Sequence, residues 1–193
     1  MNQTLNIEVA DCKLEVDIQQ VDSTTLRVSY NFLNQSQQNA YLFNRIYDDI
    51  TDDDIYATDR NLMYVEIEKG NVILSKKIIP VPAGTLVEKP IIPCASKVKA
   101  GLGFKETILV KLPLKPWTPY FMPLDEDLAE APAESQVFVE LGFFLAPPEG
   151  DKLAQTVETS DGLALYFYPF PVSSQKLMRV GPVSWTIPIL MPK

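Results

Sequence analysis

The chain has 193 residues, with 17 basic and 25 acidic side chains, a net charge of −8 and no histidine. The lack of histidine excludes Ser-His-Asp and Cys-His nucleophiles and every histidine-ligated zinc or iron site. The acidic balance argues against a nucleic-acid-binding protein and against docking on an anionic membrane, because both need a basic surface. With 46% hydrophobic and 22% charged residues, the composition is that of an ordinary globular protein.

Sorting signals and cysteines bear on the cellular compartment. No apolar run approaches the roughly 18 residues needed to span a bilayer, and residues 1–5 have neither the basic nor the apolar region of a signal peptide. Cys12 and Cys94 are too few for a disulfide framework or a cysteine-only zinc site. We therefore expect a cytoplasmic protein with two buried thiols. Cys12 is in phase with an apolar row and is predicted to face inward, whereas Cys94 follows Pro93 in a loop-like stretch and is predicted to be the more accessible.

The first part of the chain alternates between apolar and polar residues, which is typical of β-strands. Residues 5–9 alternate in one phase and residues 12–18 in the opposite phase, so we expect a bulge or a sharp bend at Ala10-Asp11. Residues 26–32 alternate again as far as a polar segment, after which residues 41–43 resume strand character. We interpret residues 26–43 as a hairpin with a long connection.

Two further hairpins carry stronger turn signals. Residues 63–67 lead into Lys69-Gly70-Asn71 and return over residues 72–74. Residues 156–159 lead into Ser160-Asp161-Gly162 and return over residues 163–168. Glycine beside Asn or Asp supplies the positive φ angles of tight hairpin turns, so both segments are predicted as hairpins.

The remaining alternating segments complete an all-β pattern. They cover residues 104–112, 137–145 and 183–189, and Pro188 in the last of them indicates an edge strand. The one helix signal is the acidic segment 124–131, which is expected to form a turn or two. The predicted fold class is all-β: an antiparallel two-sheet β-sandwich of about 8–11 strands with at most one short helix, forming a single domain over residues 1–193.

Two segments resemble immunoglobulin-like domains. Residues 26–34 read LRVSYNFLN and are followed by Gln35-Ser36, in the manner of a strand that runs into an Asn-Ser loop. Residues 98–101 read VKAG and precede the strand at 104–114, which resembles the loop-glycine-strand entry of these domains. The Cys…Trp…Cys spacing of antibody domains is absent. The resemblance implies an immunoglobulin-like β-sandwich and carries no residue-level function.

The densest group of carboxylates is a candidate metal site. It consists of Asp48, Asp49, Asp52, Asp53 and Asp54, with Asp59 shortly after. Hard cations such as Ca²⁺ bind several carboxylate oxygens on a loop, but this segment lacks the central glycine and the closing glutamate of an EF-hand loop. Mutual repulsion also keeps an acidic loop extended and solvated. We expect a solvated loop, and no metal or other cofactor.

Other charged residues offer no catalytic pattern. A hydrolase of the glycosidase type needs two carboxyl groups held across a cleft, and alternation is expected to turn most of the strand glutamates toward solvent. These are Glu66, Glu68, Glu106 and Glu140. The lysines at 97, 99, 105, 111 and 115 form either a solvated set with cross-strand partners or a basic docking stripe; the last three are expected to point outward. We assign no catalytic residue, and the sequence argues against an enzyme without excluding one.

A proline-rich segment is the candidate partner-binding site. Residues 113–123 have proline at 113, 116 and 119, a spacing that favours polyproline II, and carry the aromatic residues Trp117, Tyr120 and Phe121. The segment is either a stiff crossover whose aromatics plug an open end of the core or a preordered docking strip. Our hypothesis is that it is partly exposed and contacts a protein partner through these three side chains.

The leading functional hypothesis is a non-catalytic protein-binding or scaffolding module. Its partner is expected to be a protein, with no role for nucleic acid or membrane. The alternative is a carbohydrate- or ligand-binding β-sandwich that uses surface aromatics such as Tyr166, Tyr168 and Trp117 as stacking platforms. A third hypothesis is a calcium-dependent or hydrolytic domain built on the acidic loop.

Overall fold

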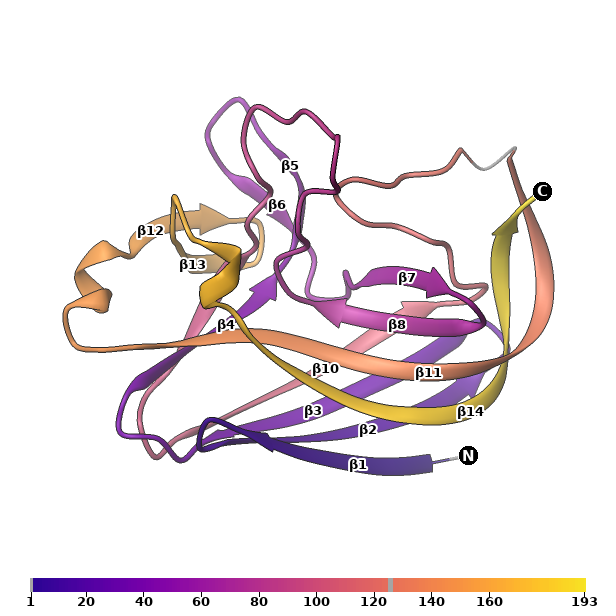
Figure 1. Ribbon diagram of the computed structural model, residues 1–193, viewed down its shortest axis with the longest axis horizontal. Coiled ribbons are helices and arrows are strands. Elements are labelled where there is room, and N and C mark those ends of the chain that lie inside the picture. The colour runs from indigo at the N-terminus through magenta and orange to yellow at the C-terminus, as the bar shows by residue number, and fades with distance from the viewer. Residues whose placement is uncertain (1, 125–126) are drawn as a thin grey trace.

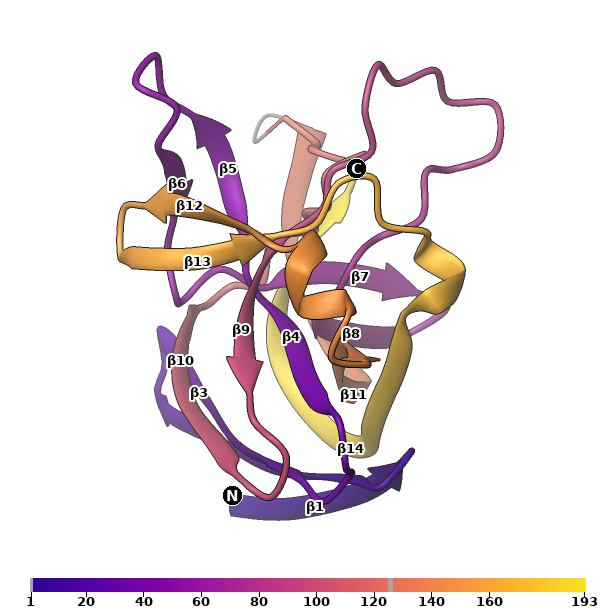
Figure 2. The same ribbon diagram turned by 90° about the vertical axis from the view of Figure 1, so that its left-hand side faces the viewer.

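β-Strands make up 61% of the chain. The computed structural model describes residues 2–124 and 127–193, and these residues contain no α-helix, only short 3-10 turns such as η2 (Gly150–Leu153) and η3 (Val172–Ser174). The strands form two sheets packed face to face (Figures 1 and 2). The prediction of an all-β sandwich is confirmed.

The first sheet has four antiparallel strands in the order β1-β2-β3-β10. Their bounds are β1 (Asn2–Val9), β2 (Cys12–Asp22), β3 (Thr25–Asn34) and β10 (Gly103–Lys111). Alternate side chains over residues 12–18 of β2 and 26–32 of β3 point into the core and are buried, as the period-two pattern predicts. The phase change at Ala10-Asp11 is a two-residue hairpin turn, since Val9 pairs with Cys12 and both turn residues have positive φ angles, 51° and 57°.

The second sheet is larger and is organised around one long strand. In sheet order its strands are β5 (Tyr47–Ile50), β6 (Tyr56–Thr58), β12 (Gln155–Thr159), β13 (Gly162–Tyr166), β9 (Cys94–Val98), β4 (Asn39–Arg45), β11 (Leu128–Ala146), β8 (Asn71–Lys76) and β7 (Tyr64–Glu68). β14 (Lys176–Pro192) pairs antiparallel with β11 along most of its length, while β8 pairs with β11 in parallel. β11 therefore pairs with three strands of this sheet, β4, β8 and β14.

The main core lies between the two sheets. Phe32 of β3 and Phe143 of β11 meet edge to face there, with ring centroids 5.4 Å apart. Both predicted hairpins are confirmed, β7 with β8 and β12 with β13. The hairpins β5–β6 and β12–β13 project from the second sheet, on the side of the molecule away from β1 (Figures 1 and 2). The two segments that resemble immunoglobulin-like domains correspond to β3 and to the residues that lead into β10, and β3 and β10 pair with each other. Membership of the immunoglobulin-like superfold stays a prediction.

The predicted hairpin over residues 26–43 is wrong. β3 belongs to the first sheet and β4 to the second, where β4 pairs with β9 and β11. Asn34 is fully buried at the corner between them: its side-chain amide donates to the carbonyls of Gln38 (2.8 Å) and Val98 (3.0 Å), and its Oδ1 accepts from the Ser36 hydroxyl (2.7 Å). A buried amide with satisfied hydrogen bonds fixes a sharp crossover that local alternation does not reveal.

The expected helical turn over residues 124–131 is present only at its start, where Asp127 has 3-10 conformation and its backbone N–H donates to the Leu124 carbonyl (3.1 Å). Leu128 begins β11, and the strand pairs with β14 from Leu128–Pro192 onward, so sheet pairing overrides the local acidic signal. Residues 125 and 126 of that segment lie outside the described residues. β14, which contains Pro188, lies beside β11 at the margin of the sheet, as predicted for an edge strand.

Both cysteines are free and fully buried. The prediction of two buried thiols is therefore confirmed, whereas the prediction that Cys94 is the more accessible of the two is wrong, because Cys94 begins β9 and packs with Tyr47 and Ala164. Burial is the main reason that the pKa of Cys12 rises to about 11 and that of Cys94 to about 12, and the neighbouring carboxylates of Asp11 and Asp161 act in the same direction.

These buried thiols predict a loss of stability in alkali. In the unfolded chain both thiols ionise at their ordinary pKa of 9.0, whereas in the folded chain they hold their protons to about 11 and about 12. The free energy of unfolding should therefore fall as pH rises above 9. Urea unfolding at pH 8, 9 and 10 should show this decline, and a Cys12→Ala/Cys94→Ala variant should show a shallower one. An unchanged slope in the variant would mean that other groups cause the decline.

Candidate functional site

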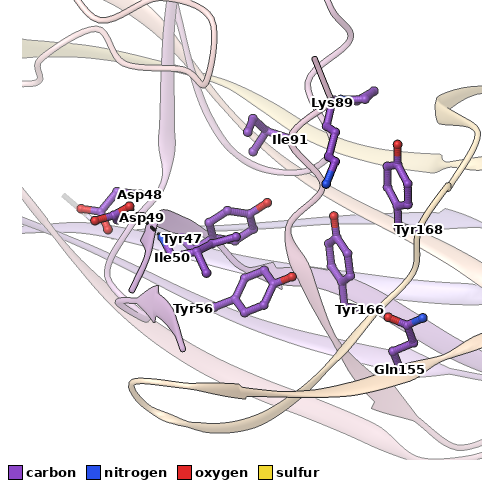
Figure 3. A pocket seen from close by; sticks show the side chains of 11 residues that line it. Tyr47, Asp48, Asp49, Ile50, Tyr56, Lys89, Ile91, Gln155, Tyr166 and Tyr168 are labelled. Atoms are coloured by element: carbon purple, nitrogen blue, oxygen red, sulfur yellow. Dashed lines mark hydrogen bonds between the residues drawn. The ribbon is translucent and has the colours of Figure 1, made fainter. Parts of the chain in front are cut away.

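A tyrosine-lined cleft of about 490 Å³ opens where three parts of the second sheet meet. These are the β5–β6 hairpin, the β12–β13 hairpin and the loop around Lys89–Ile91. Its walls are Tyr47, Asp48, Asp49, Ile50, Tyr56, Lys89, Pro90, Ile91, Gln155, Tyr166 and Tyr168 (Figure 3). We call this feature the tyrosine cleft.

Strand register brings the tyrosines together from distant parts of the sequence. Tyr56 pairs with Ile50 across the β5–β6 hairpin, and a parallel bridge joins Tyr56 to Thr159 of β12. Tyr166 lies opposite Gln155 on the β12–β13 hairpin. One bridge between hairpins that lie about a hundred positions apart in the chain therefore creates the cleft.

The four rings contact one another in sequence. Tyr47 and Tyr56 meet edge to face with centroids 4.8 Å apart, and Tyr56 lies 5.4 Å from Tyr166. Tyr166 is the last residue of β13 and Tyr168 lies two residues beyond it; their rings are parallel, with 2° between planes and 6.5 Å between centroids. Tyr168 is the outermost, with 46% of its surface exposed. The exposure of the aromatic rings therefore increases from the floor of the cleft, where Tyr47 is buried, to its open wall at Tyr168.

Three phenols of the cleft, those of Tyr47, Tyr56 and Tyr166, have a pKa raised above the ordinary value. Burial is the main cause in each case: it raises the pKa of Tyr56 to about 12 and holds those of Tyr47 and Tyr166 above their usual range. Neighbouring phenols and Cys94 add to the effect. At neutral pH the cleft thus offers uncharged hydroxyls that can both donate and accept hydrogen bonds.

Charged groups stand at two places on the rim. In Figure 3 the Lys89 ammonium reaches toward the hydroxyl ends of Tyr47 and Tyr166, while the carboxylates of Asp48 and Asp49 lie at the far end and point away from the rings. The amide of Gln155 lies beneath Tyr168. The cleft combines ring faces with a few polar groups, a composition typical of sites for small polar ligands.

Sequence reasoning found part of this site. Tyr166 and Tyr168 were expected as surface aromatics, and the structure places both in the cleft, whereas Trp117 lies elsewhere. Tyr47, Tyr56 and Lys89 were missed. Tyr47 precedes the acidic segment and Tyr56 follows it. Their positions at the two ends of a predicted loop were the available sequence signal that both belong to one site.

The acidic loop is the turn of the β5–β6 hairpin. Asp48 and Asp49 belong to β5, while Asp52, Asp53 and Asp54 form an exposed turn. The turn is closed by a backbone bond from the Thr51 N–H to the Ile55 carbonyl (2.9 Å) and by the Ile55 N–H, which donates to the Thr51 hydroxyl (3.2 Å). In the part of the chain that the structure describes, no group of three or more acidic or cysteine side chains is arranged to hold a metal ion. The carboxylates are spread around the turn rather than converging.

Calcium titration checks the expectation that this loop binds no metal tightly. Because the carboxylates diverge, calorimetry with Ca²⁺ at physiological salt should show no micromolar site. Ca²⁺ at millimolar concentration should also leave the melting temperature unchanged, since a bound ion would raise it by mass action. A saturable isotherm that disappears in an Asp52→Ala/Asp54→Ala variant would contradict this prediction.

The three predicted partner-binding residues do not form one exposed strip. Trp117 is half-buried: its backbone bridges Val65 of β7, and its ring lies 5.1 Å from that of Tyr64. The Tyr120 hydroxyl accepts a hydrogen bond from the Ile91 backbone (3.0 Å). Phe121, by contrast, is 50% exposed. The segment therefore has a packed side and a solvent side, and its binding of a partner stays a prediction.

The expectation that the strand glutamates face solvent is wrong for the two central ones. Glu106 accepts hydrogen bonds from Lys76 (3.2 Å) and from the Tyr30 hydroxyl (2.7 Å) inside the sandwich. Glu140 is likewise buried and bonds to Lys77, which also bonds to Glu66. Glu106 shares the inward parity of Ile108 and Val110, a signal that was readable in the sequence. These carboxylates are tied in ion pairs and do not face each other across an open cleft.

The basic residues from 97 to 115 lie at the surface. Lys97 is committed to an ion pair with Asp151, at 2.6 Å, while Lys99, Lys105 and Lys111 are exposed. The outward direction predicted for the β10 lysines is confirmed. Both interpretations of these lysines, a solvated set with cross-strand partners and a basic docking stripe, stay predictions.

Comparisons with protein-family models, with curated proteins and with solved structures find no match to this chain. Among residues 2–124 and 127–193, no helix has the length and apolar character needed to cross a bilayer. The cytoplasmic location stays a prediction.

Proposed function

We propose that this protein is a non-catalytic binding module whose tyrosine cleft holds a saccharide. The observation that carries the proposal is the pair of parallel rings, Tyr166 and Tyr168, which forms an open wall above a floor of uncharged phenols. Sugar rings have apolar C–H faces that pack on aromatic faces and hydroxyls that need hydrogen-bond partners at the edge. Tyrosine supplies both in one rigid side chain.

Polar groups around the rings support the same ligand class. The phenol hydroxyls and the Gln155 amide donate and accept hydrogen bonds without charge, and Lys89 adds a donor at the rim. Asp48 and Asp49 lie within reach of an oligosaccharide that extends along the cleft, and their carboxylates accept from sugar hydroxyls. A cleft of about 490 Å³ falls in the range of small-ligand sites.

Glycan binding tests the proposal. The wild-type protein should bind a defined class of glycans on an array, with a dissociation constant measurable by calorimetry. Tyr168→Ala should weaken that binding at least tenfold, because it removes the exposed half of the stacking wall. Phe121→Ala is the matched control, since it truncates an equally exposed aromatic outside the cleft. Absence of any glycan ligand, or equal binding by the Tyr168→Ala variant, would overturn the proposal.

A protein-binding role is the second candidate, and an exposed apolar patch favours it. Phe121, Met122 and Leu124 are 50%, 68% and 61% exposed, and Met191 borders the same depression as Phe121. Large apolar side chains grouped in this way mark interaction surfaces on soluble proteins. We define these four residues as the apolar patch.

Substitutions distinguish saccharide binding in the tyrosine cleft from protein binding at the apolar patch. If the apolar patch binds a protein, Phe121→Asp/Met122→Asp should abolish recovery of a specific partner in affinity purification, and Tyr168→Ala should leave it intact. Circular dichroism and melting curves of both variants should match wild type, because the altered side chains are largely exposed. Identical partner recovery by wild type and the patch variant would remove this candidate.

A further inference from the structure

β1 is a long sheet edge that lacks the usual protection. Its eight residues, Asn2–Val9, pair with β2 throughout, and in the described part of the chain β2 is its sole ladder partner. β1 contains no proline, lysine or arginine, and Glu8 is its only charged residue. In Figures 1 and 2 it forms the lower rim of the molecule, and β14 of the facing sheet lies close to it without sharing a ladder with it in the described residues.

Every other edge strand carries a device that hinders strand addition. β5 is four residues long and bears Asp48 and Asp49. The backbone of β7 is bridged by Trp117, and β14 contains prolines 182 and 188 and is bonded by Leu114. β10 carries two exposed lysines, and Asn61 accepts a hydrogen bond from the Leu109 backbone. The contrast singles out β1.

The core-facing row of β1 is also incompletely covered. Leu5, Ile7 and Val9 are only partly buried, although they pack against the main core. The corresponding row of β2, from Cys12 to Ile18, is fully buried. Covering the β1 row would remove more apolar surface from water, and this burial would favour the pairing of β1 with another strand.

We propose that β1 pairs antiparallel with β1 of a second copy of this chain and forms a continuous eight-stranded sheet. A two-fold axis at Asn6 would place Leu5 opposite Ile7 and keep the apolar rows of both copies on one face. It would set Glu8 opposite Thr4, so no like charges would meet. The strand is therefore complementary to itself, which favours a second copy over an unrelated peptide.

The interface would be modest in size. One strand pair with its flanking side chains buries less area than the roughly 1,200–2,000 Å² of a standard stable interface, so a weak dimer is the expected form. Sedimentation velocity over a concentration series that reaches the millimolar range should show a reversible monomer–dimer equilibrium. Hydrogen exchange of the β1 amides should slow as the dimer fills, while exchange elsewhere should stay constant.

Substitutions test the register. Asn6→Cys should form a disulfide-linked dimer under mild oxidation, because the two residues face each other at the axis. Thr107→Cys, on the outer face of the opposite edge strand, is the matched control and should cross-link far more slowly; the native thiols are buried. Asn6→Lys should weaken dimerisation several-fold, because two ammonium groups would then meet.

Three results would overturn the proposal: a monomer at every concentration, a dimer whose β1 amides exchange as fast as the monomer's, or cross-linking of Asn6→Cys no faster than that of Thr107→Cys. Protection of β1 amides by another protein at concentrations where the chain itself is monomeric would assign the edge to a different partner and would also overturn it.

Discussion

Replacing Glu106 with glutamine is expected to lower the free energy of unfolding by about 3–5 kcal/mol, the cost of leaving a buried charge without its partner. Glu106 lies between the sheets with its side chain 6% exposed, and it faces Lys76, whose side chain is 1% exposed. Arg45 of β4 pairs with the other carboxylate oxygen. The substitution keeps the shape of the side chain and removes the charge that both cations require.

The surroundings of Lys76 make this loss severe. Its ammonium donates to the carbonyls of Asn44 (3.1 Å) and Arg60 (2.7 Å) as well as to Glu106, so all three of its donors are used. Burial lowers the pKa of Lys76 to about 8, which shows that its charge is held at a cost. Glu106 is the acidic group in contact that offsets this cost.

Equilibrium urea unfolding at pH 7 measures the effect. Glu68→Gln, at an exposed glutamate of β7, is the matched control and should unfold like wild type. Adding Lys76→Met to the Glu106→Gln variant should restore part of the lost stability, because it removes one stranded cation. Loss of less than about 1 kcal/mol in Glu106→Gln, the range of surface pairs, would show that solvent or rearrangement compensates the charge.

The pH dependence provides a second readout. Burial opposes ionisation of Glu106, yet Lys76, Tyr30 and Arg45 together hold its pKa below the ordinary value of 4.5. Its contribution is therefore present above pH 4.5 and is lost as pH falls through the lower folded pKa. The difference between wild type and Glu106→Gln should be full at pH 7 and should shrink in strongly acidic solution, where Glu106 is itself neutral.

Alternation was sufficient to predict the local part of the fold. In β2, inward and outward residues alternate as the sequence indicates, and Cys12 is buried for that reason. Gly70 and Gly162 marked the turns of two hairpins correctly. These features depend on neighbours along the chain, which is the information that a single sequence carries.

Features that depend on distant pairing could not be predicted in this way. The crossover after β3 is fixed by hydrogen bonds from the Asn34 side chain to the carbonyls of Gln38 and Val98. Cys94 is buried because β9 lies between β4 and β13. The candidate site has the same origin, since the parallel bridge between Tyr56 and Thr159 leaves no periodic trace in either segment. Tyr166 and Tyr168, which were predicted as surface aromatics, lie two residues apart in the sequence, whereas Tyr56, which contacts Tyr166, comes from another hairpin.

Gly142 shows how a distant contact can constrain one backbone position. It lies in the middle of β11, where the side-chain amide of Gln175 accepts from the Ile78 backbone N–H (2.7 Å) and donates to its carbonyl (3.1 Å). A Cβ atom added to Gly142 would overlap Gln175 Oε1 and would lie 2.9 Å from Lys77 Cα. Both distances are shorter than a van der Waals contact, and the Lys77 Cα atom belongs to the backbone.

Gly142→Ala should therefore lower the free energy of unfolding by about 3 kcal/mol, the upper part of the range for overpacking a buried site. The corresponding fall in melting temperature is about 6–12 °C for a chain of this length, measurable by calorimetry. Gly103→Ala, at a strand glycine where an added Cβ would come no closer than 3.3 Å, to Phe32 O, is the control and should cost clearly less. In a Gln175→Ala background the Gly142→Ala penalty should shrink, because one of the two clashing groups is gone, and the residual penalty reports the Lys77 backbone. Equal penalties in both backgrounds would mean that the backbone contact alone excludes a side chain at this position.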